Sequence, residues 1–306
     1  MHVSDTDRRG RVEGEDPAGV SQASSAATIA ATRRIYKEAT MLRSMKGLTG
    51  FTIGATDGDI GRVDGCYFDD DRFTVRHLVV DTGGWLSGRK VLISPMALRE
   101  IDWAGGRIEA ALTRAQVEKS PLIATDRPVS RQQEGEYHRY YGYPSYWTGP
   151  YLWGAYPYPY PYPAPDRGTT FEQERRWTRE DGTAGDPHLR SSTAVLGYHV
   201  AATDGDIGHV EDFLVDESTW AICYLVVDTS NWWFGKKVLV SSEWVTRVDW
   251  DDSLVHVDLT RARIKASPEY DLSGPVLRDY EVRLHDYYGR PGYWSPRSDE
   301  AAARRR

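Results

Sequence analysis

Apolar and polar residues alternate through two long stretches of the chain, which is the pattern of β-strands with one buried face. In the runs GRVDGCYFD and FTVRHLVVD, this pattern places Val63, Val75 and Leu78 in strands bounded by Gly and Asp. Shorter runs follow at KVLIS, ALREIDW and RIEAAL. About six short strands in roughly 65 residues, with no helical pattern between them, predict a small closed β-barrel.

The same pattern returns 147 residues later in one register. LRS occurs at Leu42 and again at Leu189, LVVDT and LTRA occur once in each stretch, and HRYYGYPSYW is matched by HDYYGRPGYW. We call residues 42–147 the first copy and residues 189–294 the second copy. A repeat of this length predicts a duplicated domain, and two copies are too few for a solenoid. We therefore expect two similar globular units, each a small β-barrel.

Short helices are expected after the last strand of each copy. TRAQVEKSP and TRARIKASP predict one such helix in each copy, with Thr113 and Thr260 as N-caps. A second helix is expected over about 131–141, because Ser130 begins a capping box and Gly142 can end the helix.

The segment between the copies contains alternating tyrosine and proline. Proline fixes φ and lacks a backbone donor, so this segment predicts an extended polyproline-II spacer outside any core. A ligand for an aromatic groove is the alternative interpretation. The predicted organisation is a disordered tail at 1–40, a barrel at 42–124, a helix and aromatic tail at 125–147, a Tyr/Pro-rich and polar linker at 148–188, a barrel at 189–271, and a helix and tail at 272–306.

Charge and cysteine content argue against a nucleic-acid-binding protein and against a structural zinc site. The 306 residues carry a net charge of -7 with a pI of about 5.7, so no nucleic-acid partner is expected. Cys66 and Cys223 are not at equivalent positions of the two copies and predict buried thiols, and the absence of Cys-x-x-Cys argues against structural zinc. No apolar run approaches the roughly 18 residues of a membrane span. The N-terminus has no apolar signal segment, and we expect a cytoplasmic protein.

The motif ATDGDIG occurs at 55–61 and at 202–208. Its paired carboxylates raise the possibility of a cation loop, but the position of the EF-hand glutamate falls on Phe68. Asp-Gly between two alternating runs is a strong hairpin signal. We predict that Asp57-Gly58 and Asp204-Gly205 form turns, with a weak cation site as the alternative.

The sequence contains two further candidates for an enzymatic or metal site. Asp81 and Asp228 stand in DTG and DTS, similar to the paired motifs of bilobed aspartic proteases. The supporting apolar-apolar-Gly segment is missing, however, so both are predicted to accept backbone hydrogen bonds at strand ends. His138 and His285 lie in separate copies, which argues against a shared metal site. We expect no catalytic residues, no cofactor and no metal, and therefore no enzyme.

Aromatic residues gather in the loop before the GRKV or GKKV strand. Trp85 occupies this loop in the first copy, and Trp232, Trp233 and Phe234 occupy it in the second. Large apolar loop residues mark interfaces, so we predict that these four residues bind a partner. The alternative is that a tryptophan covers the end of its barrel.

Three motifs in a fixed order give each copy a resemblance to a known family. They are G-x-I-G-x-V at 58–63 and 205–210, H/Y-L-V-V-D-T at 77–82 and 224–229, and G-R/K-K-V-L-I/V-S in each copy. Each copy resembles the PRC-barrel family, which includes the cytoplasmic part of the photosynthetic reaction-centre H subunit and the C-terminal part of a ribosome maturation factor. The resemblance implies a compact β-barrel used as an adaptor, without common catalytic residues.

The expected function is therefore that of a non-enzymatic tandem PRC-barrel adaptor that binds a protein partner or itself. Three alternatives stay open: an accessory of electron transport similar to the H subunit, a factor in RNA processing or ribosome assembly, and an aspartic protease. The acidic charge argues against the RNA alternative, and the sequence around DTG and DTS argues against the protease.

Overall fold

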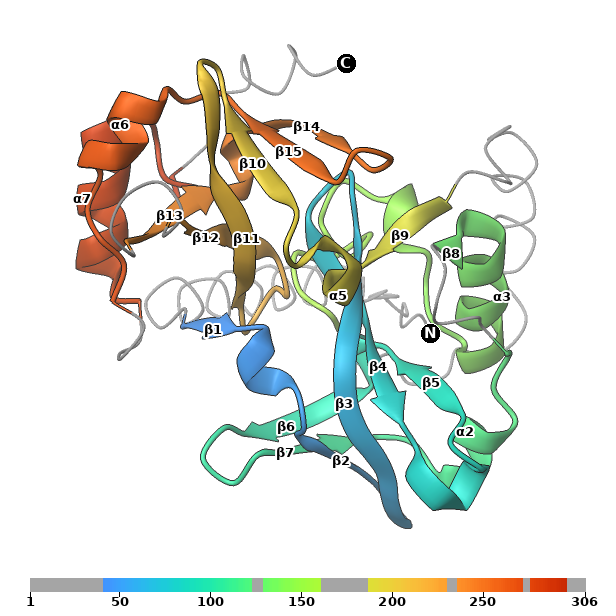
Figure 1. The fold of residues 1–306 in the computed structure, drawn as a ribbon. Coiled ribbons are helices and arrows are strands. Elements are labelled where there is room, and N and C mark those ends of the chain that lie inside the picture. The colour runs from blue at the N-terminus through green and yellow to red at the C-terminus, as the bar shows by residue number, and fades with distance from the viewer. Residues whose placement is uncertain (1–40, 123–128, 161–186, 230–235, 272–275, 296–306) are drawn as a thin grey trace, which may run out of the picture. The chain divides into compact units, whose positions relative to one another are not determined.

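A computed structural model shows a mainly β protein with short helices (Figure 1). The structure describes residues 41–122, 129–160, 187–229, 236–271 and 276–295. Two β-sheets contain all the strands in these ranges. The mainly β fold class predicted from the alternating pattern is confirmed.

The first sheet follows from the alternating runs of the first copy. It contains β2 (Thr52–Ala55), β3 (Gly58–Asp69), β4 (Thr74–Asp81), β5 (Lys90–Ile93), β6 (Leu98–Asp102) and β7 (Arg107–Ala110). These strands pair in the order β5-β4-β3-β2-β7-β6, and only β2 and β7 run parallel. Strand β4 is buried along its length except at Asp81, so its ionisable residues Arg76 and His77 lie inside the protein.

The second sheet has the same strand order in the equivalent part of the second copy. It contains β10 (His199–Ala202), β11 (Gly205–Asp216), β12 (Ile222–Asp228), β13 (Lys237–Ser241), β14 (Val245–Asp249) and β15 (Leu254–Val257). The order is β13-β12-β11-β10-β15-β14, with β10 and β15 parallel.

The predicted closure of each sheet into a barrel is corrected by the strand pairing. In the described ranges no pairing joins β5 to β6, or β13 to β14, which are the ends of the two strand orders. A 3-10 helix lies between the strands of each pair, η3 (Pro95–Ala97) in the first copy and η5 (Ser242–Trp244) in the second. It turns the chain, so that the next strand pairs with β7 or with β15 instead.

Two further strands connect the copies reciprocally. β1 (Leu42–Ser44) belongs to the first copy but pairs with β11 of the second, where Leu42 lies opposite Asp216. β9 (Pro187–Ser191) precedes the second sheet but pairs with β3 of the first, where Leu189 lies opposite Asp69. The two LRS segments thus make equivalent pairings, because each pairs with the long strand of the other copy.

Side chains reinforce this strand exchange. Asp212 accepts hydrogen bonds from the Ser44 hydroxyl and, at 3.0 Å, from the backbone N–H of Lys46. The rings of Phe68 and Phe213, one from each copy, lie 5.7 Å apart between centroids. Buried residues of both sheets accordingly form a single hydrophobic cluster.

The three helices with predicted capping residues begin where those residues indicate. The α-helices are α2 (Arg114–Glu118), α3 (Arg131–Tyr141), α5 (Ser192–Val195), α6 (Arg261–Ala266) and α7 (Arg278–Tyr288). Thr113 and Thr260 cap α2 and α6, Ser130 and Gln133 form the capping box of α3, and Gly142 ends that helix in the left-handed conformation. These predictions are confirmed. The remaining short elements are β8 (Val129–Ser130), η1 (Lys46–Leu48), η2 (Gly83–Leu86) and η4 (Tyr146–Thr148).

The caps of α3 and α7 differ, and this gives a paired prediction. Leu277 holds the N-cap position of α7, is 64% exposed and makes no side-chain cap bond, whereas Ser130 caps α3. We expect Ser130→Ala to lower the free energy of unfolding by about 1 kcal/mol and Leu277→Ser to raise it by a similar amount. Urea unfolding monitored by circular dichroism measures both. Equal stability of Leu277→Ser and the parent chain would contradict the role of the cap.

The two ATDGDIG motifs form hairpin turns, as predicted, and each has a second structural role. β2 and β3 meet at Asp57-Gly58, and β10 and β11 meet at the equivalent turn. The Asp57 carboxylate accepts the backbone N–H of Arg114 at 2.7 Å, and Asp204 accepts that of Arg261 at 2.7 Å. Each turn therefore also holds the first residue of α2 or α6.

The segment after the first copy departs from the prediction of a spacer outside any core. Trp153 is 1% exposed, and its indole N–H donates to the carbonyl oxygen of Thr219 in the second copy at 2.8 Å. The buried ring precedes the Tyr-Pro alternation from which the spacer was predicted. The remainder of the predicted linker, 161–186, lies outside the described residues.

Both cysteines are free and buried, as predicted, and burial raises the pKa of the Cys66 thiol to about 12. Among the described residues, no helix combines the length and the apolar character needed to cross a membrane.

Candidate functional site

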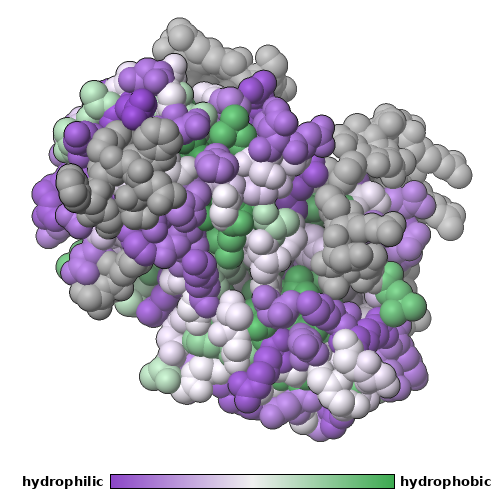
Figure 2. All heavy atoms as spheres, viewed as in Figure 1, coloured by the Kyte–Doolittle hydropathy of each residue, from purple (hydrophilic) through white to green (hydrophobic). Residues whose placement is uncertain are grey.

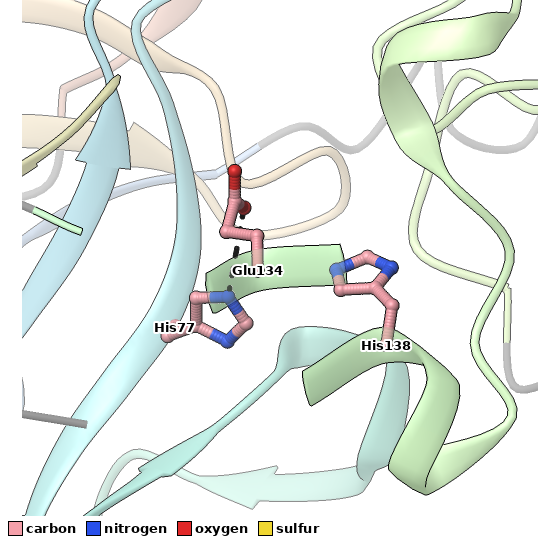
Figure 3. A group of neighbouring side chains, drawn as sticks. All are labelled: His77, Glu134 and His138. Atoms are coloured by element: carbon pink, nitrogen blue, oxygen red, sulfur yellow. Dashed lines mark ion pairs between the residues drawn. The ribbon is translucent and has the colours of Figure 1, made fainter. Parts of the chain in front are cut away.

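Three buried ionisable side chains meet between β4 and α3 (Figure 3). They are His77 on β4, and Glu134 and His138 on successive turns of α3, with exposed fractions of 0%, 0% and 3%. One potential ligand atom from each lies within 4.8 Å of the others. Two imidazoles and a carboxylate can bind a divalent transition metal, so this cluster is the candidate functional site.

Local sequence positions each of the three side chains. Glu134 and His138 are four residues apart, which places them on one face of the helix. The capping box at Ser130 fixes where that helix begins. His77 reaches the same space because β4 is buried on both faces.

Glu134 is ionised in spite of its burial. Burial acts to raise its pKa, but the electrostatic interaction with His77 and the positive charge of Arg131 outweigh this, and its pKa is lowered. Arg131 donates to Oε2 at 3.0 Å, and the Tyr146 hydroxyl lies 2.8 Å from Oε1 and 2.9 Å from Oε2. A carboxylate of fixed orientation therefore stands beside both histidines.

His138 has a defined tautomer. Its Nδ1 lies 2.9 Å from the carbonyl oxygen of Pro144, which can only accept, so Nδ1 carries the proton. Burial lowers the pKa of His138 to about 4, so the imidazole is neutral at neutral pH. Its Nε2 consequently keeps a free lone pair.

His77 has no hydrogen-bond partner for either ring nitrogen. Its Nε2 lies 3.8 Å from Oε1 of Glu134, which exceeds hydrogen-bond distance. Leaving a buried polar group unsatisfied costs about 1–3 kcal/mol. The His77 ring therefore lies next to Glu134 and His138, but no protein atom forms a hydrogen bond with either of its nitrogens.

A buried ion pair lies next to the cluster. The Arg76 guanidinium donates from Nε to Asp69 at 2.6 Å and from Nη1 to the Leu152 carbonyl at 2.7 Å. It also lies 3.6 Å from the centroid of the Tyr146 ring. Asp69 therefore neutralises the positive charge of Arg76, the residue that directly precedes His77.

The second copy holds an equivalent cluster with one decisive difference. Tyr224 stands at the position of His77, and its hydroxyl is 2.8 Å from Nε2 of His285. Because Nδ1 of His285 faces the Pro291 carbonyl at 3.0 Å, it carries the ring proton, and Nε2 accepts a hydrogen bond from the Tyr224 hydroxyl. Glu281 is bound by Arg278 and by the Tyr293 hydroxyl, as Glu134 is bound in the first copy. The lone pair that stays free in the first copy is used here by a hydroxyl.

Of the four predicted partner-binding residues, the structure describes Trp85, which is not part of this cluster. Trp85, on η2, is half-buried, and its indole N–H donates to the Ile60 carbonyl while the Arg114 guanidinium lies 4.3 Å from the ring centroid. This contact links the loop to the beginning of β3. Trp232, Trp233 and Phe234 fall outside the described residues.

Of the two aspartates in DTG and DTS, Asp81 has the predicted strand-end role. Its carboxylate accepts the backbone N–H of Gly83 at 2.9 Å. Asp228 ends β12 in the other sheet.

The cluster itself was missed because the two histidines considered for a metal, His138 and His285, belong to different helices. The partner of His138 is His77, which is 61 residues earlier in the sequence. Two signals could have identified it. The helix contains Glu-x-x-x-His, and His77 interrupts an apolar strand at a position where the second copy has Tyr224.

Comparison with known families identifies one domain. Residues 190–264 match the PRC-barrel domain, a region that begins within β9 and ends in α6. A comparison with curated proteins finds no significant match.

Proposed function

We propose that this chain is a non-enzymatic adaptor built from two PRC-barrel-like domains that bind a protein partner or a second copy of the chain. The family match covers 190–264. The extension to the first copy is supported by the sequence repeat and by the identical order of the equivalent strands.

The observation that carries this proposal is the reciprocal pairing of β1 with β11 and of β9 with β3. An adaptor with two domains on a loose tether needs no strand exchange. Here each copy completes the sheet of the other, and one hydrophobic cluster runs through both. We infer that the two copies fold and bind as one module.

Exposed aromatic side chains supply candidate contacts. Figure 2 shows mostly polar residues on one face, with hydrophobic residues visible in small areas between them. Tyr151 and Tyr160 are 52% and 42% exposed, and the ring of Tyr160 stacks on that of Tyr156 at 5.0 Å. Tyrosine and tryptophan are enriched in interfaces, so these rings and the tryptophan loops are the proposed contact residues.

The tryptophan loop of the second copy gives the test. Replacing both Trp232 and Trp233 with alanine should weaken association by about tenfold or more, because interface tryptophans often contribute over 1 kcal/mol each. Sedimentation equilibrium measures self-association, and quantitative affinity capture from the native cell measures partner binding.

Trp85→Ala is the matched comparison. Its ring is bound to Ile60 and Arg114 within its own copy, so we expect a smaller effect on association and a larger one on stability. Circular dichroism should show intact β structure in the double variant. Association unchanged by the double substitution would refute the assignment of the loop, and a chain that neither self-associates nor captures a partner would refute the adaptor.

An accessory role similar to that of the photosynthetic reaction-centre H subunit is the second candidate, favoured only by the PRC-barrel match. Co-purification with pigment–protein membranes would support it. A cytoplasmic location stays a prediction from the sequence.

A further inference from the structure

His77 presents an unusual combination of burial and missing partners. Its side chain is fully buried, and both ring nitrogens lack a hydrogen bond. A buried imidazole normally has at least one partner, since an unsatisfied polar group is costly in the interior. A bound ion that accepts the imidazole lone pair would satisfy one of the two nitrogens and so lower this cost.

The neighbouring atoms have the spacing of ligands around one ion. Tetrahedral nitrogen and oxygen ligands about 2.1 Å from zinc lie about 3.4 Å from one another. Nε2 of His77 and Oε1 of Glu134 are 3.8 Å apart, too far for a hydrogen bond but close to this value. With His138, the full set of ligand atoms lies within 4.8 Å, so small side-chain movements would bring all three to an ion.

Two of the three side chains, His138 and Glu134, also have the contacts that orient metal ligands. Ligating histidines usually donate their other ring N–H to a carbonyl or a carboxylate, which orients the lone pair. His138 makes this contact with the Pro144 carbonyl. Glu134 is oriented by Arg131 and Tyr146, and Asp69 balances the charge of Arg76 beside the cluster.

The second copy has the equivalent arginine, glutamate, histidine and tyrosine side chains, but a hydroxyl takes the place of the third metal ligand. The Tyr224 hydroxyl is already bonded to Nε2 of His285 and replaces the third ligand. The two copies therefore differ at position 77 and its equivalent 224. The residue there decides whether Nε2 of the helix histidine, His138 or His285, already has a hydrogen-bond partner.

We propose that His77, Glu134 and His138 bind one divalent transition-metal ion such as Zn²⁺, which commonly takes two imidazoles and one carboxylate, and that the second copy binds none. The ion would join β4 to α3 and stabilise the first copy. This inference does not depend on the proposed adaptor function.

Metal content after folding tests the site directly. Because the cluster is buried, the full chain should be refolded with Zn²⁺, treated briefly with a chelating resin, and analysed by inductively coupled plasma mass spectrometry. We expect about one zinc per chain, and a melting temperature at least about 5 °C higher than that of chain refolded with chelator. Refolding with Co²⁺ should give the visible absorption of a low-symmetry site.

The repeat provides matched variants in both directions. His77→Tyr places the residue of the second copy in the first, and should abolish zinc retention and the stabilisation by metal. Tyr224→His places the residue of the first copy in the second, and should raise the content to about two zinc ions per chain. Glu134→Gln, with circular dichroism as the check on folding, serves if His77→Tyr does not fold.

Two results would overturn the proposal. The parent chain could retain no zinc after refolding, which would leave His77, Glu134 and His138 as a buried polar cluster without a metal. Zinc could also be retained equally by folded His77→Tyr or Glu134→Gln, which would place the metal at other histidines.

Discussion

Replacing Asp69 with alanine is expected to lower the free energy of unfolding by about 3–5 kcal/mol. Asp69 is 2% exposed, and its carboxylate is the ion-pair partner of the buried Arg76 at 2.6 Å. Removing it leaves a buried guanidinium without its counter-charge, which costs far more than the net value of the pair. It also removes the acceptor for the backbone N–H of Arg72.

The control for this prediction is an exposed aspartate in the same sheet. Asp64 pairs with Lys90, and both side chains are more than two-fifths exposed, so Asp64→Ala should cost at most about 1 kcal/mol. The double change Asp69→Ala with Arg76→Met should recover much of the loss, because no unpaired charge remains. Urea unfolding measures all three variants. Similar stability of Asp69→Ala and Asp64→Ala would show that the buried pair lacks this role.

Gly208→Ala is expected to cost about 3 kcal/mol or more, or to prevent folding. A Cβ at this position would lie 2.0 Å from the carbonyl oxygen of Asp228, a backbone atom that cannot rotate away. The φ of Gly208 is +144°, which side chains rarely adopt. Gly61→Ala should behave similarly, since its Cβ would lie 2.0 Å from the Asp81 carbonyl oxygen.

Gly84→Ala separates this effect from a general loss of glycine. Nothing lies within 4 Å of a Cβ at Gly84, and its backbone is not in the left-handed region. We expect its stability to differ from that of the parent by only a few tenths of a kcal/mol. A stability of Gly208→Ala equal to that of Gly84→Ala would refute the close approach between β11 and the end of β12.

The two copies share most residues of the cluster, and one exchange changes what the cluster can bind. Arg131, Glu134, His138 and Tyr146 have direct equivalents in Arg278, Glu281, His285 and Tyr293. The framework is therefore shared, and the exchange between His77 and Tyr224 changes its chemistry. One copy is arranged to hold an ion, and the other is closed by a hydroxyl.

Much of the local structure could be predicted because its causes are local. The capping box at Ser130 and the left-handed Gly142 set the two ends of α3, and both are short-range signals. Asp57-Gly58 and Asp204-Gly205 formed hairpins for the same reason. The PRC-barrel resemblance is supported for 190–264 by the family match.

The features that were missed depend on contacts between distant residues. The partner of β1 is β11, far along the chain, and three residues of LRS carry no signal for it. Trp153 is buried because Thr219 and Arg76 lie near it, not because of its own surroundings in sequence. His77 was treated only as part of a strand motif, because its ionisable neighbours Glu134 and His138 lie on α3, far along the sequence.

Differential scanning calorimetry of the full chain tests most directly whether the two copies form one module. The strand exchange predicts a single transition whose calorimetric and van't Hoff enthalpies agree. Gly61→Ala and Gly208→Ala lie in different copies, and each should move this one transition to lower temperature. Two separate transitions, with each variant affecting only the transition of its own copy, would contradict the account.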